Sequence, residues 1–173
     1  MIAAWLTFWS ASVKDRSPIS PPRSPPRLIL ILGAPPHPQI GSEQYLGYTS
    51  EEMKLQNEGR KILHLPELKV SCTCVRVPVV RSHSVSVLLV TKEKISVERA
   101  KELIAKAPGC KLVDDLKNKI YPMPLDTSDQ DLIFVGRIRE DLTNERGLNL
   151  WCCGDQVRKG AATNAIQIAE LLL

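Results

Sequence analysis

The spacing of apolar residues along the chain predicts three helices. The first opens at residues 49–52 (TSEE), which have the pattern of a capping box, and we expect it to end near Leu63. The second follows Ser96, and residues 108–109 (PG) end it. The third covers residues 156–173. The apolar positions of these helices are Met53, Ile62 and Leu63, then Val97, Ala100, Leu103, Ile104 and Ala107, then Val157, Ala161, Ala165, Ile168 and Leu172.

Five further segments are predicted to be strands. Residues 69–79 are rich in Val, Thr and Cys, and residues 84–91 alternate between apolar and polar positions over most of their length. Shorter strands are expected near residues 111–113, 132–139 and 148–153. Two strands precede the second helix and three follow it, without a regular alternation of strand and helix. We therefore expect an α+β fold with a mainly antiparallel sheet.

The N-terminal part of the chain has a different composition. Eight of the 13 prolines lie at or before Pro38, and residues 16–27 (RSPISPPRSPPR) exclude both a helix and a central strand. We expect residues 1–38 to be a disordered or extended leader. Its richness in Arg and Ser is similar to that of a transit peptide, and the alternative is a leader that is not native to the following domain. The predicted compartment is the cytoplasm, or the plastid stroma if the leader is a transit peptide.

Composition and charge exclude several classes of protein. The chain has 173 residues, of which 43% are hydrophobic and 24% charged, as in ordinary globular proteins. Residues 1–40 carry four basic residues and one acidic residue, so they hold +3 of the net charge of +4. The remaining +1 gives no support for a nucleic-acid-binding face. The apolar run at residues 28–32 is too short to span a membrane.

Four polar residues are candidates for site chemistry. His83 lies between two predicted strands and can act as an acid or base near neutral pH. Arg76, seven positions earlier, can hold a carboxylate in bidentate fashion. Glu51 and Lys54 are three residues apart on one helix face, where they can meet the amine and the phosphate of a small substrate. The structural alternatives are a loop histidine, a solvent-facing arginine and a surface ion pair.

The five cysteines form an odd set, which fits a reducing compartment better than a disulfide scaffold. Two pairs, Cys72 with Cys74 and Cys152 with Cys153, have four thiols in total, which would suffice for a zinc ion. The spacing is unlike a zinc knuckle, because adjacent strand residues point to opposite faces. We therefore interpret these residues as buried strand cysteines and predict no metal site.

Several motifs, in the same order and with the same spacing, give the chain a family resemblance. From Gly47 to Leu173 it resembles the C-terminal half of aspartate-semialdehyde dehydrogenase. The motifs that carry the resemblance are residues 51–54 (EEMK), 74–79 (CVRVPV), 81–84 (RSHS), 121–125 (YPMPL), 135–139 (VGRIR) and 154–162 (GDQVRKGAA). That family reduces β-aspartyl phosphate with NADPH to aspartate semialdehyde and phosphate, on the route to lysine, threonine and methionine.

The resemblance implies a role for five residues. His83 matches the family's acid/base histidine, and Arg76 matches the arginine that holds the substrate carboxylate. Glu51 matches the carboxylate near the substrate amine, and Lys54 matches the phosphate-binding lysine. Gln156 matches a glutamine that contacts the nicotinamide cofactor. The implied ligands are NADP, aspartyl phosphate or aspartate semialdehyde, and phosphate.

The resemblance also implies how the chain is organised. Residues 39–155 match the substrate-binding and dimerisation domain, whose helices pack on one face of the sheet, and residues 156–173 match a helix that packs on the family's cofactor domain. The family's nucleophilic cysteine and glycine-rich cofactor loop belong to the N-terminal half and have no counterpart in this sequence. We therefore expect a truncated enzyme that is inactive alone and forms a homodimer or pairs with a homologue. The alternatives are a non-catalytic dimerisation module and a fragment of the N-acetyl-glutamyl-phosphate reductase type.

Overall fold

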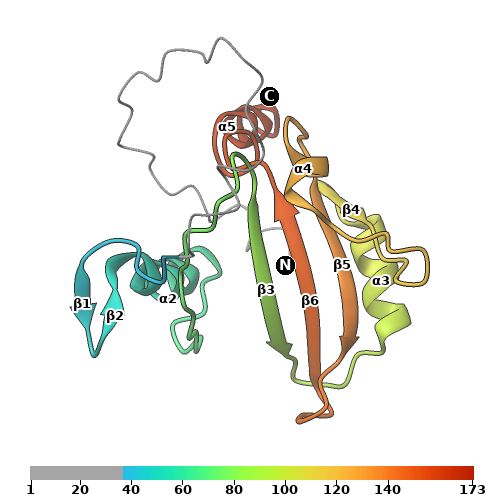
Figure 1. Ribbon diagram of the computed structural model, residues 1–173, viewed down its shortest axis with the longest axis horizontal. Helices are drawn as coiled ribbons and strands as arrows, with labels where there is room; N and C mark the ends of the chain where they lie inside the picture. The colour runs from blue at the N-terminus through green and yellow to red at the C-terminus, as the bar shows by residue number, and fades with distance from the viewer. Residues whose placement is uncertain (1–36) are drawn as a thin grey trace. The chain divides into compact units, whose positions relative to one another are not determined.

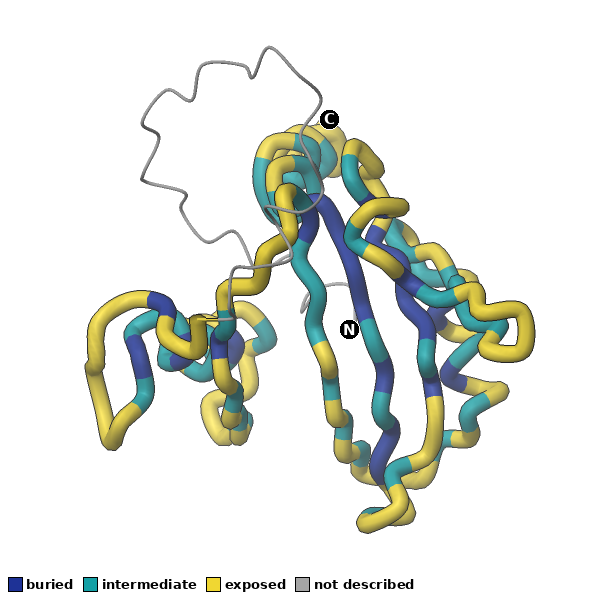
Figure 2. The backbone as a smooth tube through the Cα atoms, viewed as in Figure 1, coloured by how far each residue is buried: buried dark blue, intermediate teal, exposed yellow. Residues whose placement is uncertain are grey.

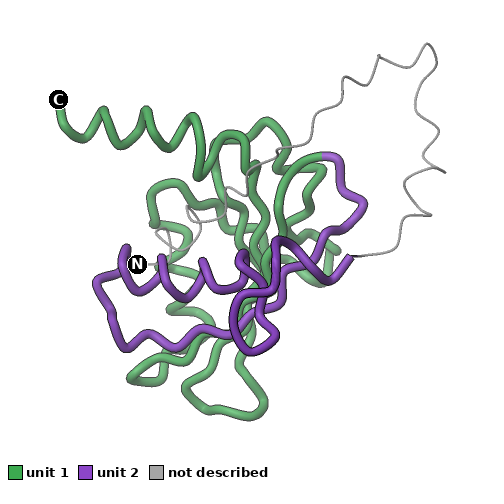
Figure 3. The backbone as a smooth tube through the Cα atoms, turned by 90° about the vertical axis from the view of Figure 1, so that its left-hand side faces the viewer, with its two compact units in different colours: residues 1–10, 81–173 green, residues 11–80 purple. Residues whose placement is uncertain are grey.

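The computed structural model describes residues 37–173, which form two compact units (Figure 3). The described residues of one unit run from 37 to 80, and those of the other from 81 to 173. This division falls inside the predicted domain of residues 39–155, whose limits stay a prediction. The predicted leader lies outside the described residues except for His37 and Pro38.

The unit of residues 37–80 begins with a hairpin that the sequence patterns did not predict. Strands β1 (Glu43–Tyr45) and β2 (Tyr48–Thr49) pair antiparallel (Figure 1). Leu46 and Gly47 connect them with φ of 48° and 82°, the backbone that a tight hairpin turn requires. The strands are too short for an alternating pattern to be visible in the sequence.

Helix α2 (Ser50–Ile62) follows the hairpin directly and confirms the first predicted helix. The predicted capping box is present. The Thr49 hydroxyl accepts a hydrogen bond from the Glu52 backbone N–H at 3.4 Å, and the Glu52 carboxylate accepts one from the Thr49 N–H at 2.8 Å. Two N–H groups at the start of the helix are thereby satisfied.

The predicted strand at residues 69–79 is wrong. In this segment only Arg76 forms a β-bridge, in which the backbones of Arg76 and His37 exchange two hydrogen bonds of 2.9 Å. The Cys74 N–H donates to the Glu52 side chain instead of to a strand, and Pro78 has no N–H to donate. The Val-, Thr- and Cys-rich composition is typical of a strand. Here, however, the Cys74 N–H binds a side chain of helix α2 and not the backbone of a neighbouring strand.

The unit of residues 81–173 is built on a four-stranded sheet. Its strands are β3 (His83–Val90), β4 (Cys110–Leu112), β5 (Ile133–Glu140) and β6 (Gly147–Gly154), in the order β3-β6-β5-β4. β6 pairs antiparallel with both β3 and β5, while β4 pairs parallel with β5. The predicted α+β class and the mainly antiparallel sheet are confirmed.

Helix α3 (Val97–Lys106) packs on one face of this sheet, and Ser96 caps it as predicted. Its buried residues meet apolar side chains that alternate along the strands, and Figure 2 shows that the buried positions concentrate in β5 and β6. The core of this unit consists of Ala100, Ile104, Ile133, Val135, Ile138, Leu148, Leu150 and Cys152. Cys152 and Cys153 are both buried on β6, as the sequence predicted.

The opposite face of the sheet is more open. Across β3 and β6 it presents Ser86, Leu88, Val90, Asn149 and Trp151, which alternate with the core positions and are exposed or half-buried. Leu88 and Val90 are each 55% exposed. We call these five residues the open face.

A bulge interrupts β5 after Gly136. A Cβ atom at Gly136 would lie 1.9 Å from the Val113 carbonyl oxygen, so only glycine fits there. The Asp114 carboxylate accepts hydrogen bonds from the N–H groups of Arg137 (2.9 Å) and Ile138 (3.2 Å), which would otherwise lack a ladder partner. Asp114 also pairs with Lys101 at 3.0 Å and so ties the bulge to α3.

The predicted C-terminal helix is shorter than expected. Residues 156–161 form turns, and the helix α5 covers Ala162–Glu170. The Asp155 side chain accepts the Val157 N–H at 2.9 Å, and Gly160 has a φ of 86° that a helix does not permit. In Figure 1, α5 and the short helix α4 (Pro124–Thr127) lie at the end of the sheet where β3 begins. Among residues 37–173, no helix is long and apolar enough to cross a membrane.

Packing of α3 on the sheet is testable at two neighbouring positions. Ile104 is 1% exposed and Leu103 is 42% exposed, so only Ile104 fills the core. Ile104→Ala should lower the free energy of unfolding by about 2–5 kcal/mol, because it leaves a cavity. Leu103→Ala should change it by less than about 1 kcal/mol. Urea denaturation measures both, and equal losses would contradict this packing.

Candidate active site

Glu51 and Lys54 lie in the first turns of α2 and face each other. The Lys54 Nζ and the Glu51 Oε2 are 2.9 Å apart. The Glu51 side chain is 12% exposed and that of Lys54 is 50% exposed, so the ammonium group remains open to solvent. The hydrogen bond to Glu51 raises the pKa of Lys54. The pair offers one positive and one negative group on the same helix face.

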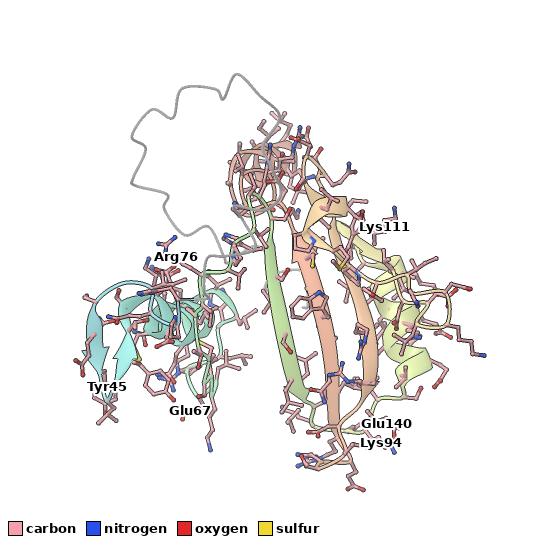
Figure 4. All side chains as sticks on the ribbon, in the orientation of Figure 1. Tyr45, Glu67, Arg76, Lys94, Lys111 and Glu140 are labelled. Carbon is pink, nitrogen blue, oxygen red and sulfur yellow. The ribbon has the colours of Figure 1, made fainter. Side chains whose placement is uncertain are left out.

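Glu52, which sequence reasoning assigned only to the capping box, joins this helix to the segment that carries Arg76. Its Oε2 accepts the Thr49 N–H, and its Oε1 accepts the Cys74 N–H at 2.9 Å. Arg76 follows two residues later and is exposed; its side chain extends outward from the unit (Figure 4). The hydrogen bonds from the Thr49 and Cys74 backbones lower the pKa of Glu52. Glu51, Lys54 and Arg76 thus share one compact unit.

The cysteines of this unit are not arranged as a metal site. The Cys72 thiol donates to the Glu52 carbonyl oxygen at 3.6 Å, and its interaction with Cys74 lowers the pKa of Cys72 and raises that of Cys74. On β6, burial raises the pKa of Cys152 to about 12. Within residues 37–173, no group of three or more His, Cys, Asp and Glu side chains could hold a metal ion.

His83 is the first residue of β3 and is half-buried. Its partner across the sheet is Gly154, the last residue of β6. The preceding residue, Ser82, is buried and has a φ of 77°, which non-glycine residues rarely adopt. The residue immediately before β3 therefore has a left-handed backbone conformation, and His83 follows it directly.

Gln156 lies close to this entry point. Its Oε1 accepts a hydrogen bond of 2.9 Å from the N–H of Ser82, the residue immediately before His83. The side chain of Gln156 is therefore bound to the backbone next to His83. The amide nitrogen of Gln156 can still donate to a ligand. This arrangement follows from the β3–β6 pairing, because Gln156 is two residues beyond the partner of His83.

A charged network behind His83 was missed by sequence reasoning. Arg81 forms ion pairs with Asp155 (Nε–Oδ2, 2.8 Å) and with Asp129 (NH1–Oδ1, 2.9 Å). Asp155 is fully buried. Two of these residues stood in motifs that the sequence analysis quoted, RSHS at 81–84 and GDQVRKGAA at 154–162. Periodicity carries no signal for contacts between segments this far apart in the chain.

The unit of residues 81–173 also has charged groups at the opposite end of the sheet. Lys94 and Glu140 form an exposed ion pair of 3.5 Å there, and Lys111 lies over the ring of Phe134 at 4.6 Å from its centroid (Figure 4). The ion pair lies away from the end that carries His83, whereas Lys111 lies on the edge strand β4, where its partner Phe134 is in register with Cys153. An exposed ion pair contributes little to stability, so we assign these residues no role in the site.

Comparison with known proteins gives a consistent picture. A family model described as "Semialdehyde dehydrogenase, dimerisation domain" matches residues 36–159. The aspartate-semialdehyde dehydrogenase of Prochlorococcus marinus is 55% identical over 126 residues, which are 73% of this chain and 37% of that protein. The chain thus spans less than half the length of this relative.

Two solved structures are similar to the chain. The crystal structure of aspartate semialdehyde dehydrogenase II from Vibrio cholerae, complexed with ASA, has a TM-score of 0.76 and 41% identity, covering 80% of this chain and 40% of that one. The Candida albicans aspartate semialdehyde dehydrogenase with NADP has a TM-score of 0.63 and 26% identity, covering 80% of this chain and 44% of that one. Both likenesses cover most of the described residues.

The double contact of Glu52 predicts a pH-dependent stability. Because the folded-state pKa of Glu52 is lowered, its contribution is fully present above the unfolded pKa and is lost as the pH falls through the folded-state pKa. Glu52→Gln retains one acceptor oxygen where the wild type uses two. It should lower the free energy of unfolding by about 1–2 kcal/mol near neutral pH. Thermal unfolding should show this difference shrinking as the pH falls through the lowered pKa of Glu52.

The matched control is Glu58→Gln, an exposed position on the same helix. It should leave the stability nearly unchanged, within about 0.5 kcal/mol. A difference between wild type and Glu52→Gln that stays constant over the whole pH range would contradict the role of the carboxylate charge.

Proposed function

The chain belongs to the semialdehyde dehydrogenase family, and from this premise we propose that it provides the substrate-binding and dimerisation part of an aspartate-semialdehyde dehydrogenase. The proposed reaction is the NADPH-dependent reductive dephosphorylation of β-aspartyl phosphate to aspartate semialdehyde, which leads to lysine, threonine and methionine. The observation that carries the proposal is that the family match over residues 36–159 contains all five proposed site residues. The proposed compartment is the cytoplasm, or the plastid stroma if residues 1–38 are a transit peptide.

The substrate has three charged groups, and the unit of residues 37–80 offers a partner for each. The Arg76 guanidinium can bind the α-carboxylate through two parallel hydrogen bonds. The Glu51 carboxylate can bind the ammonium group, and the Lys54 ammonium can bind the phosphate. Glu51 and Lys54 neutralise each other at 2.9 Å, and a zwitterionic substrate would replace that contact on both sides.

His83 is the proposed general acid and base. In the family's reaction a cysteine thiolate attacks the acyl phosphate, and the aldehyde product forms through a thiohemiacetal. An imidazole with a pKa near neutrality can hold and return the proton of the thiohemiacetal oxygen. The left-handed backbone at Ser82 and the pairing with Gly154 fix the start of the strand that carries this imidazole.

Gln156 is the proposed contact to the nicotinamide. Its oxygen is engaged by the Ser82 N–H, which orients the amide nitrogen as a donor. A donor of this kind suits the carboxamide oxygen of a nicotinamide, so the residue fits the group. NADPH, when bound, supplies the hydride.

In this proposal the nucleophile and the cofactor loop belong to the cofactor-binding part of the family's enzyme. Helix α5 is the proposed contact to that part, because Ile166 and Ile168 on it, and Leu171 directly after it, are exposed. An exposed apolar helix of this kind favours association. The 173-residue chain alone is therefore proposed to be inactive, and its activity to depend on the cofactor-binding half.

We also propose that a second copy of the chain covers the open face of the sheet. The matching family model is described as a dimerisation domain, and Leu88 and Val90 on that face are each 55% exposed. A two-fold dimer places the same residues opposite each other, so an apolar strip is complementary to itself.

The catalytic proposal is testable with a fusion of residues 37–173 to the N-terminal part of the Prochlorococcus marinus relative. The fusion should oxidise aspartate semialdehyde in the presence of phosphate and NADP, and the 173-residue chain alone should not. His83→Gln should lower kcat by about 10²–10⁴-fold, the usual contribution of a general acid or base. Reduction of NADP, followed by absorbance, measures the rate.

His64→Gln, in the other compact unit, serves as the control and should retain full turnover. Arg76→Lys should raise KM for the semialdehyde, since an ammonium group cannot form the bidentate contact. The proposal is wrong if a folded fusion has no turnover, if turnover survives His83→Gln, or if the chain alone is active.

Dimerisation through the open face is testable by sedimentation velocity. Replacing Leu88 and Val90 together by lysine puts like charges on both sides of the proposed interface and should raise the dimer Kd by at least about 100-fold. Leu142→Lys, at a fully exposed position, is the matched control and should remain dimeric. A parent chain that is monomeric, or a double variant that still dimerises, would refute this interface.

A further inference from the structure

We infer that Asp155 is a positioning residue, whose buried carboxylate holds the Arg81 side chain and the Asp129 backbone and thereby sets the direction of His83. The inference rests on the proposed role of His83 and adds the groups that fix its geometry. Apart from Gln156, none of these groups is among the residues assigned to substrate or cofactor.

The position of the Asp155 carboxylate is determined from three sides. It is fully buried. Its Oδ2 lies 2.8 Å from the Arg81 Nε and accepts the Asp129 N–H at 2.7 Å, while its Oδ1 accepts the Val157 N–H at 2.9 Å. A buried carboxylate without such donors is strongly disfavoured, so these contacts form together or the local structure does not form.

Through these contacts Asp155 joins three segments that are distant in the chain. Arg81 reaches both Asp155 and Asp129, and the Ser82 hydroxyl lies 3.4 Å from the Ser128 hydroxyl. Gln156, the next residue after Asp155, accepts the Ser82 N–H. Residues 81–82, 128–129 and 155–156 are therefore cross-linked immediately before His83.

The backbone shows what this cross-linking does. Ser82 and Asp129 both have positive φ, 77° and 63°, on opposite sides of the network. Such conformations persist in non-glycine residues only where the surrounding contacts over-determine them. Because Ser82 precedes His83, its φ fixes the direction in which β3 starts and the imidazole leaves the backbone. Loss of the Asp155 charge should release that conformation.

Asp114 provides a closely matched control in the same compact unit. Its side chain is 7% exposed, it pairs with Lys101 at 3.0 Å, and it accepts two backbone N–H groups. It differs from Asp155 in its location, because it binds the backbone of the β5 bulge and not the residues that precede β3. Asp114→Asn therefore removes the same kind of interaction without touching the residues around His83.

The first test uses NMR on the full 173-residue chain at constant pH. The chain has three histidines, so the imidazole Cε1–H signals can be assigned with His83→Gln. In Asp155→Asn the His83 signal should move while those of His37 and His64 stay, and the Ser82 amide should exchange at least about 10-fold faster relative to the Leu150 amide of the core. Asp114→Asn should change neither.

Arg81→Lys is the second variant, for the case in which Asp155→Asn does not fold. Arg81 is partly exposed, and lysine keeps the charge but cannot contact Asp155 and Asp129 at once. The same two signals should change. If a folded Asp155→Asn or Arg81→Lys chain leaves His83 and Ser82 as in the parent, or if Asp114→Asn changes them equally, the inference is overturned.

The second test uses the fusion enzyme. Asp155→Asn should lower kcat by about 100-fold while KM for aspartate semialdehyde stays nearly constant, because a misplaced imidazole affects the chemical step. Asp114→Asn should retain kcat. A fusion that is inactive in every form would count against the proposed function, and the NMR result would still decide the role of Asp155.

Discussion

The antiparallel pairing of β3 with β6 is the constraint on which the rest of the larger unit depends. β6 lies between β3 and β5, and it supplies buried side chains to the core on one face and Trp151 to the other. Its register sets His83 opposite Gly154. Asp155 and Gln156, which follow Gly154, can therefore contact Arg81 and Ser82, the two residues that precede His83. A shift of one residue would move the core positions to the open face and separate the histidine from both.

The two groups of proposed site residues are held by different kinds of interaction. Glu51 and Lys54 are neighbours on one helix, so their pairing needs only a formed α2. His83 depends on contacts between segments separated by dozens of residues, which exist only after the sheet has formed. The proposed partners of the substrate's amine and phosphate are thus local in origin, whereas the proposed proton-transfer group is a product of tertiary structure.

This difference explains what the sequence could predict. The helices α2 and α3 and the strand β3 were predicted well, since capping residues and periodicity are local signals. The extended segment before Arg76 was taken for a strand because composition does not reveal its partner, the side chain of Glu52. The last helix was predicted too long because the apolar spacing does not reveal that the Asp155 side chain accepts the Val157 N–H or that Gly160 has a positive φ. The Arg81–Asp155–Asp129 network could not be predicted from the spacing of residues, because its members are far apart in the sequence.

Helix α5 has a consequence for the life of the protein in a cell. Its exposed isoleucines, and the exposed leucines that follow it, are the kind of surface that chaperones and proteases recognise on incompletely assembled chains. Molecules whose α5 is covered by a partner would escape that surveillance, and unassembled molecules would be removed. The steady-state amount of the chain would then follow the supply of its partner more closely than its own rate of synthesis.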